Sequence, residues 1–277
     1  MCPLPTTRQL YKTYLAVGKS YVPKDLYGMT HQAFVISMRG CASRCGHVDR
    51  LIRNSPIPCT RWDATDGRAL SDDQIAAVYH PTTHSPRYPF RLKPGEIGCF
   101  LSHRSIWRHI VDHSIDAALI LEDDVELLPG FTTALQMVCE SAPRGSYTQF
   151  QTRELRCEFD RIDTHGGQSL LRPRIVPLRT TAQWVTLGAA KKLLDTTPKI
   201  DRPIDSFLQL RWLHGVDVLT VSPPPVREVS HALGGSMINT RKPRGVSWPN
   251  LSREWKRFFY RQNIKRLSHA SGHSRAA

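Results

Sequence analysis

The chain has 277 residues, enough for one large domain or two small ones, and its 40% hydrophobic and 22% charged residues are ordinary for a globular protein. Its clearly apolar runs, such as residues 117–121, are far shorter than the roughly 18 to 20 residues of a membrane-spanning helix. Residues 1–20 lack the continuous apolar segment of a secretory signal, which predicts a cytoplasmic location. Composition therefore excludes a transmembrane protein and favours a soluble one.

The seven cysteines are odd in number and irregularly spaced, in a chain too long to need disulfide bonds for stability. Cys41 and Cys45 have three residues between them, but no second pair at a matching spacing accompanies them. We therefore expect reduced thiols here, in preference to a zinc site.

Positive charge is concentrated in the second part of the chain. Residues 1–150 hold 16 Lys and Arg against 14 Asp and Glu, whereas residues 151–277 hold 22 against 10. Residues 241–277 alone hold ten basic residues and one acid, Glu254. Such a concentration attracts a polyanion, whether nucleic acid, an anionic membrane surface or a phosphorylated glycolipid. Composition alone does not choose among these three.

Short apolar runs predict buried strands, and apolar residues at three- and four-residue intervals predict amphipathic helices. The Pro-rich stretch 81–94 is expected to be a surface loop, and residues 141–179 show little periodicity and are expected to be irregular. Strands and helices alternate, as is typical of an α/β fold. The predicted strands are 33–37, 59–62, 117–121, 181–186 and 216–221, and the predicted helices are 49–53, 95–111, 132–140, 188–194 and 203–212.

Three acids, Glu122, Asp123 and Asp124, directly follow the apolar run 117–121. Open α/β sheets bind their ligands at the carboxyl ends of strands. Because side chains alternate along a strand, Glu122 and Asp124 should point to one side and Asp123 to the other while the strand geometry lasts. Two carboxylates on one side suit Mg²⁺ or Mn²⁺, with a diphosphate completing the shell. For the triplet alone, a solvated strand end is the simpler interpretation.

The sequence around these acids resembles glycosyltransferase family 25, typified by bacterial lipopolysaccharide galactosyltransferases. The resemblance is carried mainly by residues 95–107 and 118–125, which read GEIGCFLSHRSIW and ALILEDDV. It covers roughly residues 33–225 in the right order. The further matching segments are 34–38, 63–67, 188–194 and 203–207.

The resemblance implies a GT-A type, Rossmann-like nucleotide-sugar-binding fold, with a donor that is usually UDP-galactose and inversion at the anomeric carbon. Glu122 and Asp124 match the family's variant of the Asp-x-Asp motif, which makes them the expected ligands of Mn²⁺ or Mg²⁺. The cation would act as a Lewis acid on the departing diphosphate. Asp123 is expected to contact ribose or metal. The other expected donor-binding residues are Ser37, Arg39, Asp63, Asp66 and His103.

An inverting transfer needs a base that takes the proton of the acceptor hydroxyl. Asp205 is the first candidate, because it matches the family's Pro-x-Asp motif, and Glu96 is the second. Both acids also occupy first-turn positions of predicted helices, where the helix dipole favours a negative charge without any catalytic role. The two interpretations remain open for both residues.

Three segments are expected: an N-terminal extension over 1–30, a GT-A-like domain over 31–240 and a basic, aromatic, helical tail over 241–277. Aromatic and basic residues together suit an anionic membrane surface, here the inner face of the cytoplasmic membrane, where a lipid-linked acceptor is found. The alternative is a helix that packs its aromatic residues on the domain. One helical face holds Leu251, Trp255, Phe258 and Phe259, and Tyr260, Ile264 and Leu267 fall nearly opposite.

The expected function is thus transfer of a hexose, galactose first, to a lipopolysaccharide or lipooligosaccharide acceptor. Another nucleotide sugar or a protein acceptor is the alternative within the enzyme class. A basic nucleic-acid-binding protein is the competing class, because the pI is near 9.8. No zinc-ligand pair or RNA-recognition signature supports that class, so no nucleic-acid partner is expected. An inactive relative is a third alternative, which the retention of all three acids disfavours.

Overall fold

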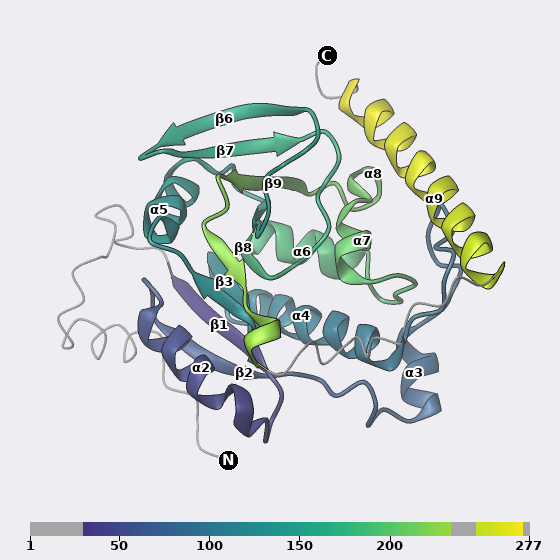
Figure 1. The fold of residues 1–277 in the computed structure, drawn as a ribbon, viewed down its shortest axis with the longest axis horizontal. Helices are drawn as coiled ribbons and strands as arrows, with labels where there is room; N and C mark the ends of the chain where they lie inside the picture. Colours follow the sequence, from purple (N-terminus) through teal and green to yellow (C-terminus); the bar gives the residue numbers. More distant parts are fainter. Residues whose placement is uncertain (1–29, 234–247, 274–277) are drawn as a thin grey trace.

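The computed structural model describes residues 30–233 and 248–273, so the expected N-terminal extension and part of the expected tail lie outside the described residues. The described chain forms a mixed α/β structure around an eight-stranded sheet (Figure 1). The strands are β1 (His31–Ser37), β2 (Cys59–Asp63), β3 (Ala117–Glu122), β4 (Val125–Leu127), β5 (Ser146–Phe150), β6 (Phe159–His165), β7 (Gln168–Pro173), β8 (Ala182–Thr186), β9 (Asp217–Ser222) and β10 (Val226–Glu228). The helices are α2 (Ala42–Asn54), α3 (Asp72–Val78), α4 (Pro94–Asp112), α5 (Phe131–Ser141), α6 (Leu187–Asp195), α7 (Ile204–Leu208), α8 (Arg211–His214), the 3₁₀ helix η2 (Ser230–Leu233) and α9 (Trp248–His273).

The order of strands in the large sheet is β2-β1-β3-β8-β5-β9-β7-β6. β1 runs parallel to both β2 and β3, and β8 runs antiparallel to β3 and β5. β4 and β10 form a separate two-stranded sheet. Ser37 pairs with Asp63, and Ile36 pairs with Glu122, so the carboxyl ends of β1, β2 and β3 meet at one edge. This edge carries the candidate site.

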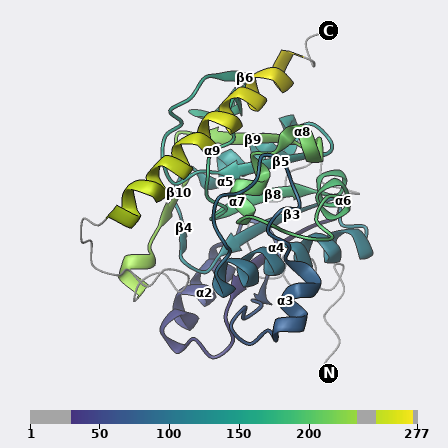
Figure 2. The same ribbon diagram turned by 90° about the vertical axis from the view of Figure 1, so that its right-hand side faces the viewer.

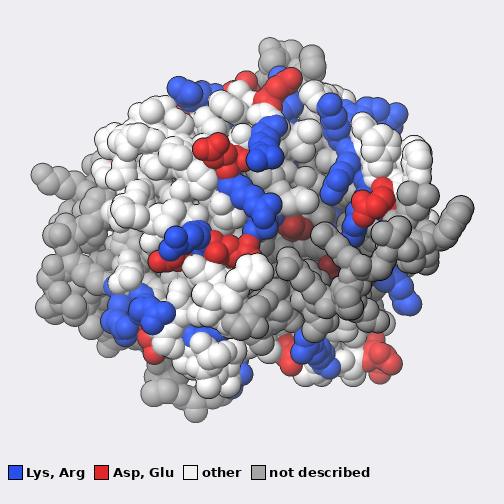
Figure 3. All heavy atoms as spheres, viewed as in Figure 1, with Lys and Arg blue, Asp and Glu red and all other residues white. Residues whose placement is uncertain are grey.

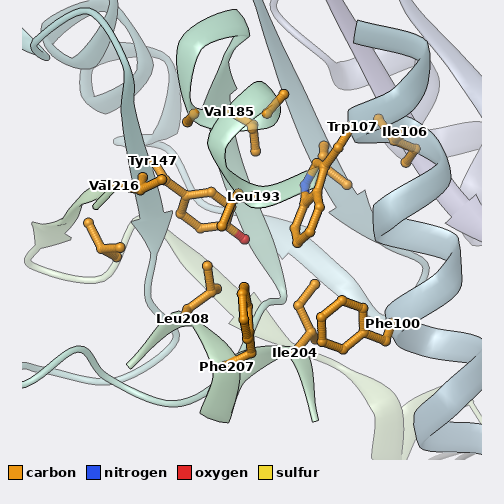
Figure 4. Packing of buried hydrophobic residues seen from close by; sticks show 14 of the residues in the cluster. Phe100, Ile106, Trp107, Tyr147, Val185, Leu193, Ile204, Phe207, Leu208 and Val216 are labelled. Carbon is orange, nitrogen blue, oxygen red and sulfur yellow. The ribbon is translucent and has the colours of Figure 1, made fainter. Parts of the chain in front are cut away.

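Apolar side chains on the two faces of the sheet form two separate cores. Helices α4, α6, α7 and α8 cover one face, and α2 and α5 cover the other. On the first face, Phe100 and Trp107 of α4 lie opposite Tyr147 of β5 and Phe207 of α7 (Figure 4). Large buried rings from three elements thus fix α4, whose first turns reach the candidate site, against the sheet.

Helix α9 runs diagonally across the molecule (Figure 2) and contacts the domain through one face. Ile264 is buried in the first core, and the hydroxyl of Tyr260 accepts a hydrogen bond of 3.0 Å from Arg202 Nη1. On the opposite face, Trp255, Phe258 and Phe259 are 57%, 50% and 58% exposed. The two faces predicted from sequence therefore differ in role, since one packs on the domain and the other lies in solvent.

Most predicted elements match the structure to within one or two residues, with three exceptions. Residues 141–179 were expected to be irregular, but they contain β5, β6 and β7, so that prediction was wrong. The run 203–212 forms two short helices, α7 and α8, and the helix predicted over 49–53 begins at Ala42. The cysteines of the described residues are free thiols, as expected. No helix among the described residues is long and apolar enough to cross a bilayer.

Candidate active site

Two neighbouring cavities open at the carboxyl ends of β1, β2 and β3. The first cavity extends from Ser37 and Arg44 to the loop 64–68, and the second extends from Arg179 to Asp205. Three residues line both cavities: Cys99 of α4, Glu122 at the end of β3, and Asp124. Figure 3 shows acidic side chains set in a recess near the centre of this face, with basic side chains of α9 beside it. Cys99, Glu122 and Asp124 thus form a wall between the two cavities, the shared wall.

The three consecutive acids have different surroundings. β3 ends at Glu122, and Asp123 and Asp124 form the turn into β4, so strand alternation does not extend over the triplet. The carboxylate of Asp123 accepts a short hydrogen bond from Arg44 Nη1, and a second from the hydroxyl of Ser37. Asp124 Oδ2 lies 3.8 Å from the same Arg44 nitrogen. Asp123 is therefore engaged by protein groups, whereas Glu122 and Asp124 face both cavities.

Burial and nearby negative charge disfavour ionisation of Asp123 and Asp124. Desolvation raises the pKa of Asp124 to about 7, the charge of Glu122 adds to this effect, and Arg44 opposes it. Burial also raises the pKa of Asp123, although the Arg44 guanidinium and the Ser37 hydroxyl act in the other direction. Several carboxylates that share one site at this cost are a common arrangement where a cation or a substrate is bound.

A chain of buried polar side chains holds Glu122 in place. Its Oε1 accepts a 3.0 Å hydrogen bond from the hydroxyl of Thr180. The backbone carbonyl of Thr180 accepts a hydrogen bond from Gln183, whose Oε1 in turn accepts a 2.6 Å bond from the hydroxyl of Tyr147. These partners come from β5, β8 and the segment before β8, so the position of Glu122 depends on strands that the sequence did not fully reveal.

The loop 64–67 is fastened to the start of α4 by close contact between two glycines. A Cβ atom on Gly67 would lie 1.8 Å from the carbonyl oxygen of Pro94, and one on Gly98 would lie 2.5 Å from the carbonyl oxygen of Thr65. Ser102 Oγ accepts a 2.8 Å hydrogen bond from the Thr65 N–H and donates one to the Gly98 carbonyl. Two of the segments that carry the family resemblance therefore form one wall of the first cavity.

The second cavity contains both candidate bases. Burial raises the pKa of Asp205, and hydrogen bonds from the backbone N–H groups of Arg179 and Ser206 act against this shift. Arg179 itself has a φ of +88°, a strained value for a residue with a side chain. Glu96 also lines this cavity, but its Oε2 accepts a 2.7 Å bond from the Lys93 N–H, which completes a capping box at the start of α4. Asp205 is thus the better placed base.

The structure separates the other predicted donor-binding residues into two groups. Ser37, Asp66 and His103 line the first cavity together with Asp123. Arg39 and Asp63 instead form an ion pair with each other at the surface, where the Arg39 side chain is 86% exposed, and they are not among the residues lining that cavity.

Many residues that line the two cavities were not predicted as site residues, and five of them bear most directly on the chemistry of the site. Arg44 and Arg179 are arginines in a chain rich in them, and Thr180 lies at the edge of a segment without periodicity. Glu228 pairs with Arg179 across the second cavity, although the two are far apart in sequence. Only Cys99 stood inside a matched motif. These five residues are Arg44, Cys99, Arg179, Thr180 and Glu228.

Comparison with known proteins bears on the family to which the chain belongs. The model of glycosyltransferase family 25, described as an LPS biosynthesis protein family, matches residues 30–208. Procollagen galactosyltransferase 2 of Mus musculus is 32% identical over 206 residues, covering 70% of this chain and 32% of that protein. Procollagen galactosyltransferase 1 of Danio rerio is 28% identical over 213 residues, covering 71% and 34%.

A third relative, inactive glycosyltransferase 25 family member 3 of Mus musculus, is 31% identical over 198 residues, covering 69% of this chain and 33% of that protein. The chain thus spans about a third of the length of these relatives. The family match includes every residue of the triplet and both candidate bases. The chain belongs to glycosyltransferase family 25.

Proposed function

We propose that this protein is an inverting glycosyltransferase that moves a hexose onto a hydroxyl of an oligosaccharide or protein acceptor. The first candidate for the hexose is galactose, with UDP-galactose as its donor. The observation that carries the proposal is the position of Glu122 and Asp124 on a wall shared by two cavities. The first cavity is the proposed donor site and the second the proposed acceptor site. The parallel strands β2-β1-β3 that end at the first cavity support a GT-A type fold.

The residues on the shared wall fit a hard divalent cation. Glu122 and Asp124 offer carboxylate oxygens, the ligand type that Mn²⁺ and Mg²⁺ prefer. Burial first, and then the charge of Glu122, raises the pKa of Asp124, and a cation between the two carboxylates would favour their ionised forms. A bound Mn²⁺ or Mg²⁺ supplies positive charge opposite the departing diphosphate. Arg44 and Ser37 keep Asp123 away from the shared wall, so Asp123 is proposed to contact the donor from the first cavity.

Asp205 is the proposed base. It lies in the second cavity, opposite the donor side of the shared wall, as attack from the opposite face of the sugar requires. Burial raises the pKa of Asp205 towards the working pH, which favours proton transfer from an acceptor hydroxyl to its carboxylate. The two backbone N–H groups that bind Asp205 fix its orientation.

Two classes of acceptor have separate support. The family description names LPS biosynthesis, which favours a lipopolysaccharide or lipooligosaccharide. The relatives named procollagen galactosyltransferases favour a protein. The exposed aromatic and basic face of α9 supports the glycolipid, because a lipid-linked acceptor brings the enzyme to an anionic membrane surface. We accordingly propose the tail as a peripheral membrane contact.

The test combines a panel of nucleotide sugars with both acceptors, lipooligosaccharide and procollagen, and measures nucleotide release and the anomeric configuration of the product. UDP-galactose should give release with inversion. Asp205→Asn should lower kcat by about 10²–10⁴-fold, the range for loss of a general base. Glu96→Gln keeps the oxygen that caps α4 and should cost far less. Equal losses in the two variants, or a retained configuration, would refute the assignment of Asp205.

The membrane contact has its own test. Binding to vesicles that contain anionic lipid should be salt-sensitive, and Trp255→Ser together with Phe259→Ser should reduce it because both rings are exposed. Undiminished binding by this double variant would remove the support that α9 gives to a lipid-linked acceptor.

A further inference from the structure

A thiol, an imidazole and a carboxylate converge at the shared wall. Cys99 and His103 are four residues apart on α4, so they lie on one face of the helix. Glu122 faces them from the end of β3. One ligand atom from each of the three residues lies within 4.8 Å of the other two. The convergence brings together helix and strand side chains whose sequence positions are far apart.

His103 is buried and lacks a hydrogen-bond partner. It is 1% exposed, and among the described residues neither of its ring nitrogens makes a hydrogen bond. Nε2 lies 3.4 Å from Glu122 Oε1, close enough for electrostatic contact only. A buried imidazole with both nitrogens unsatisfied costs free energy, which a ligand that accepts its lone pair would recover. The orphaned ring, which is aimed at Cys99 and Glu122, is an observation independent of the acidic triplet.

The chemistry of these three groups matches a softer metal than the one proposed for the diphosphate. Thiolate and imidazole favour zinc over Mg²⁺ or Mn²⁺, which prefer oxygen. A tetrahedral zinc has bonds of about 2.0–2.3 Å, so its ligand atoms lie about 3.5 Å apart. Side-chain rotations that move the ligand atoms of Cys99, His103 and Glu122 by about 1 Å would bring them to this separation. Three protein ligands leave a fourth position for water.

We propose that Cys99, His103 and Glu122 form a zinc site, and that its occupation withdraws Glu122 from the cation that binds the diphosphate. Binding replaces the thiol proton, since the thiolate is the ligand, and one proton leaves for each zinc bound. The first half of the proposal concerns metal binding alone. The second half, inhibition of transfer by zinc, rests on the proposed function.

Cobalt is a suitable probe of the site, because Co²⁺ takes up zinc ligands and a thiolate bound to it absorbs in the near ultraviolet. The metal-free full chain should bind one Co²⁺ with this absorption, and one equivalent of Zn²⁺ should displace it. Cys99→Ser should abolish the band, and His103→Gln should weaken binding at least tenfold. The double variant Cys41→Ser/Cys45→Ser is the matched control, because it removes two thiols at the start of α2 and outside the cluster, and it should keep the band.

Folding of each variant is checked by its circular dichroism and by thermal unfolding without metal. For the wild type, Zn²⁺ should raise Tm, and a folded Cys99→Ser or Cys99→Ala variant should lose that increase. A band that survives in folded Cys99→Ser, or that disappears in the α2 control, would overturn the site.

Inhibition is measured separately by adding zinc to an assay of nucleotide release with Mn²⁺. Zinc should inhibit, and excess Mn²⁺ should raise the zinc concentration needed, because both metals use Glu122. Unchanged release at full zinc occupancy would overturn the shared use of Glu122. If the protein releases no nucleotide with any donor, the proposed function fails, and the cobalt spectrum still decides the metal site.

Discussion

Two buried arginine–aspartate pairs in this protein have very different surroundings. Asp201 and Arg202, on the segment before α7, have side chains that are 0% exposed. Arg44 and Asp123 are 4% and 10% exposed, and they lie against the first cavity, beside two more acids. The first pair has every charge compensated, whereas the second leaves Asp124 with a raised pKa. The two buried pairs therefore differ in the additional acids that lie beside them.

The Asp201–Arg202 pair connects three parts of the chain. Arg202 Nη2 donates to the carbonyl oxygens of His84 and Pro86, at 3.0 and 2.9 Å. Its Nη1 donates to Tyr260 of α9, and Asp201 accepts from the His84 N–H. The next residues along the chain lead to Asp205. The loop 81–94, helix α9 and the segment before α7 are thus joined by one guanidinium.

Removing Arg202 should have the largest effect. Arg202→Met leaves Asp201 as a buried charge without its partner, which typically costs about 3–5 kcal/mol of unfolding free energy. Chemical denaturation of the wild type and the variant measures the difference. A loss below 1 kcal/mol would show that the buried pair is not the structural tie described here.

Arg44→Met, the same substitution in the other pair, should cost less, about 2 kcal/mol, because Asp123 and Asp124 can take up protons beside the cavity. Its main effect should be on activity. Loss of the guanidinium raises the pKa of Asp124 further, so the acidic limb of the pH–activity profile should move to higher pH. An unshifted limb would argue against the electrostatic role of Arg44.

Asp124→Asn should stabilise the metal-free protein by about 1–2 kcal/mol at pH 8. The folded-state pKa, about 7, lies above the ordinary value near 3.8, so the folded protein holds this proton more tightly than the unfolded chain does. The resulting cost is absent below pH 4, grows as the pH rises, and is complete above pH 7. The gain from the substitution should therefore vanish at pH 4. Unfolding curves at the two pH values check this, and an equal gain at both would contradict it.

Tyr260→Phe should have the smallest effect, a loss of about 0.5–1 kcal/mol. It removes one acceptor from Arg202, which keeps its bonds to Asp201, His84 and Pro86. If α9 is held mainly through Ile264 and packing, limited proteolysis of the helix should be unchanged in this variant. Rapid cleavage of α9 in this variant would show that the Tyr260 hydroxyl holds the helix on the domain more strongly than its single hydrogen bond to Arg202 suggests.

Sequence patterns located most of the fold because apolar runs such as 117–121 are buried on both faces. They failed at β5, whose sequence SYTQF reads as polar although all five residues are buried. Gln149 is acceptable there because its Nε2 donates a 3.0 Å hydrogen bond to the Arg179 carbonyl, whereas the buried hydroxyl of Thr148 has no hydrogen-bond partner among the described residues. β6 is an exposed edge strand, which offers no hydrophobic signal.

The site was predictable where it lies on matched motifs and strand ends, and hidden where it depends on contacts between distant segments. Glu122, Asp124 and Asp205 stood in motifs, so the sequence singled them out as candidates, and all three line the second cavity. Arg44 contacts Asp123 because the fold brings α2 to the end of β3. Thr180 contacts Glu122 because the segment before β8 lies there too. The alternation of side chains along a strand did not predict the directions of Asp123 and Asp124, because β3 ends at Glu122 and the chain turns there.

The central claim is that Glu122 and Asp124 hold the cation that binds a nucleotide-sugar diphosphate. It is tested most directly by nucleotide release from UDP-galactose, with Mn²⁺ or EDTA, for the wild type, Asp124→Ala and the control Asp160→Ala, an exposed acid on β6. The wild type and the control should release nucleotide with Mn²⁺, whereas the wild type in EDTA and Asp124→Ala should release none. Full release by Asp124→Ala, or by the wild type in EDTA, would contradict it.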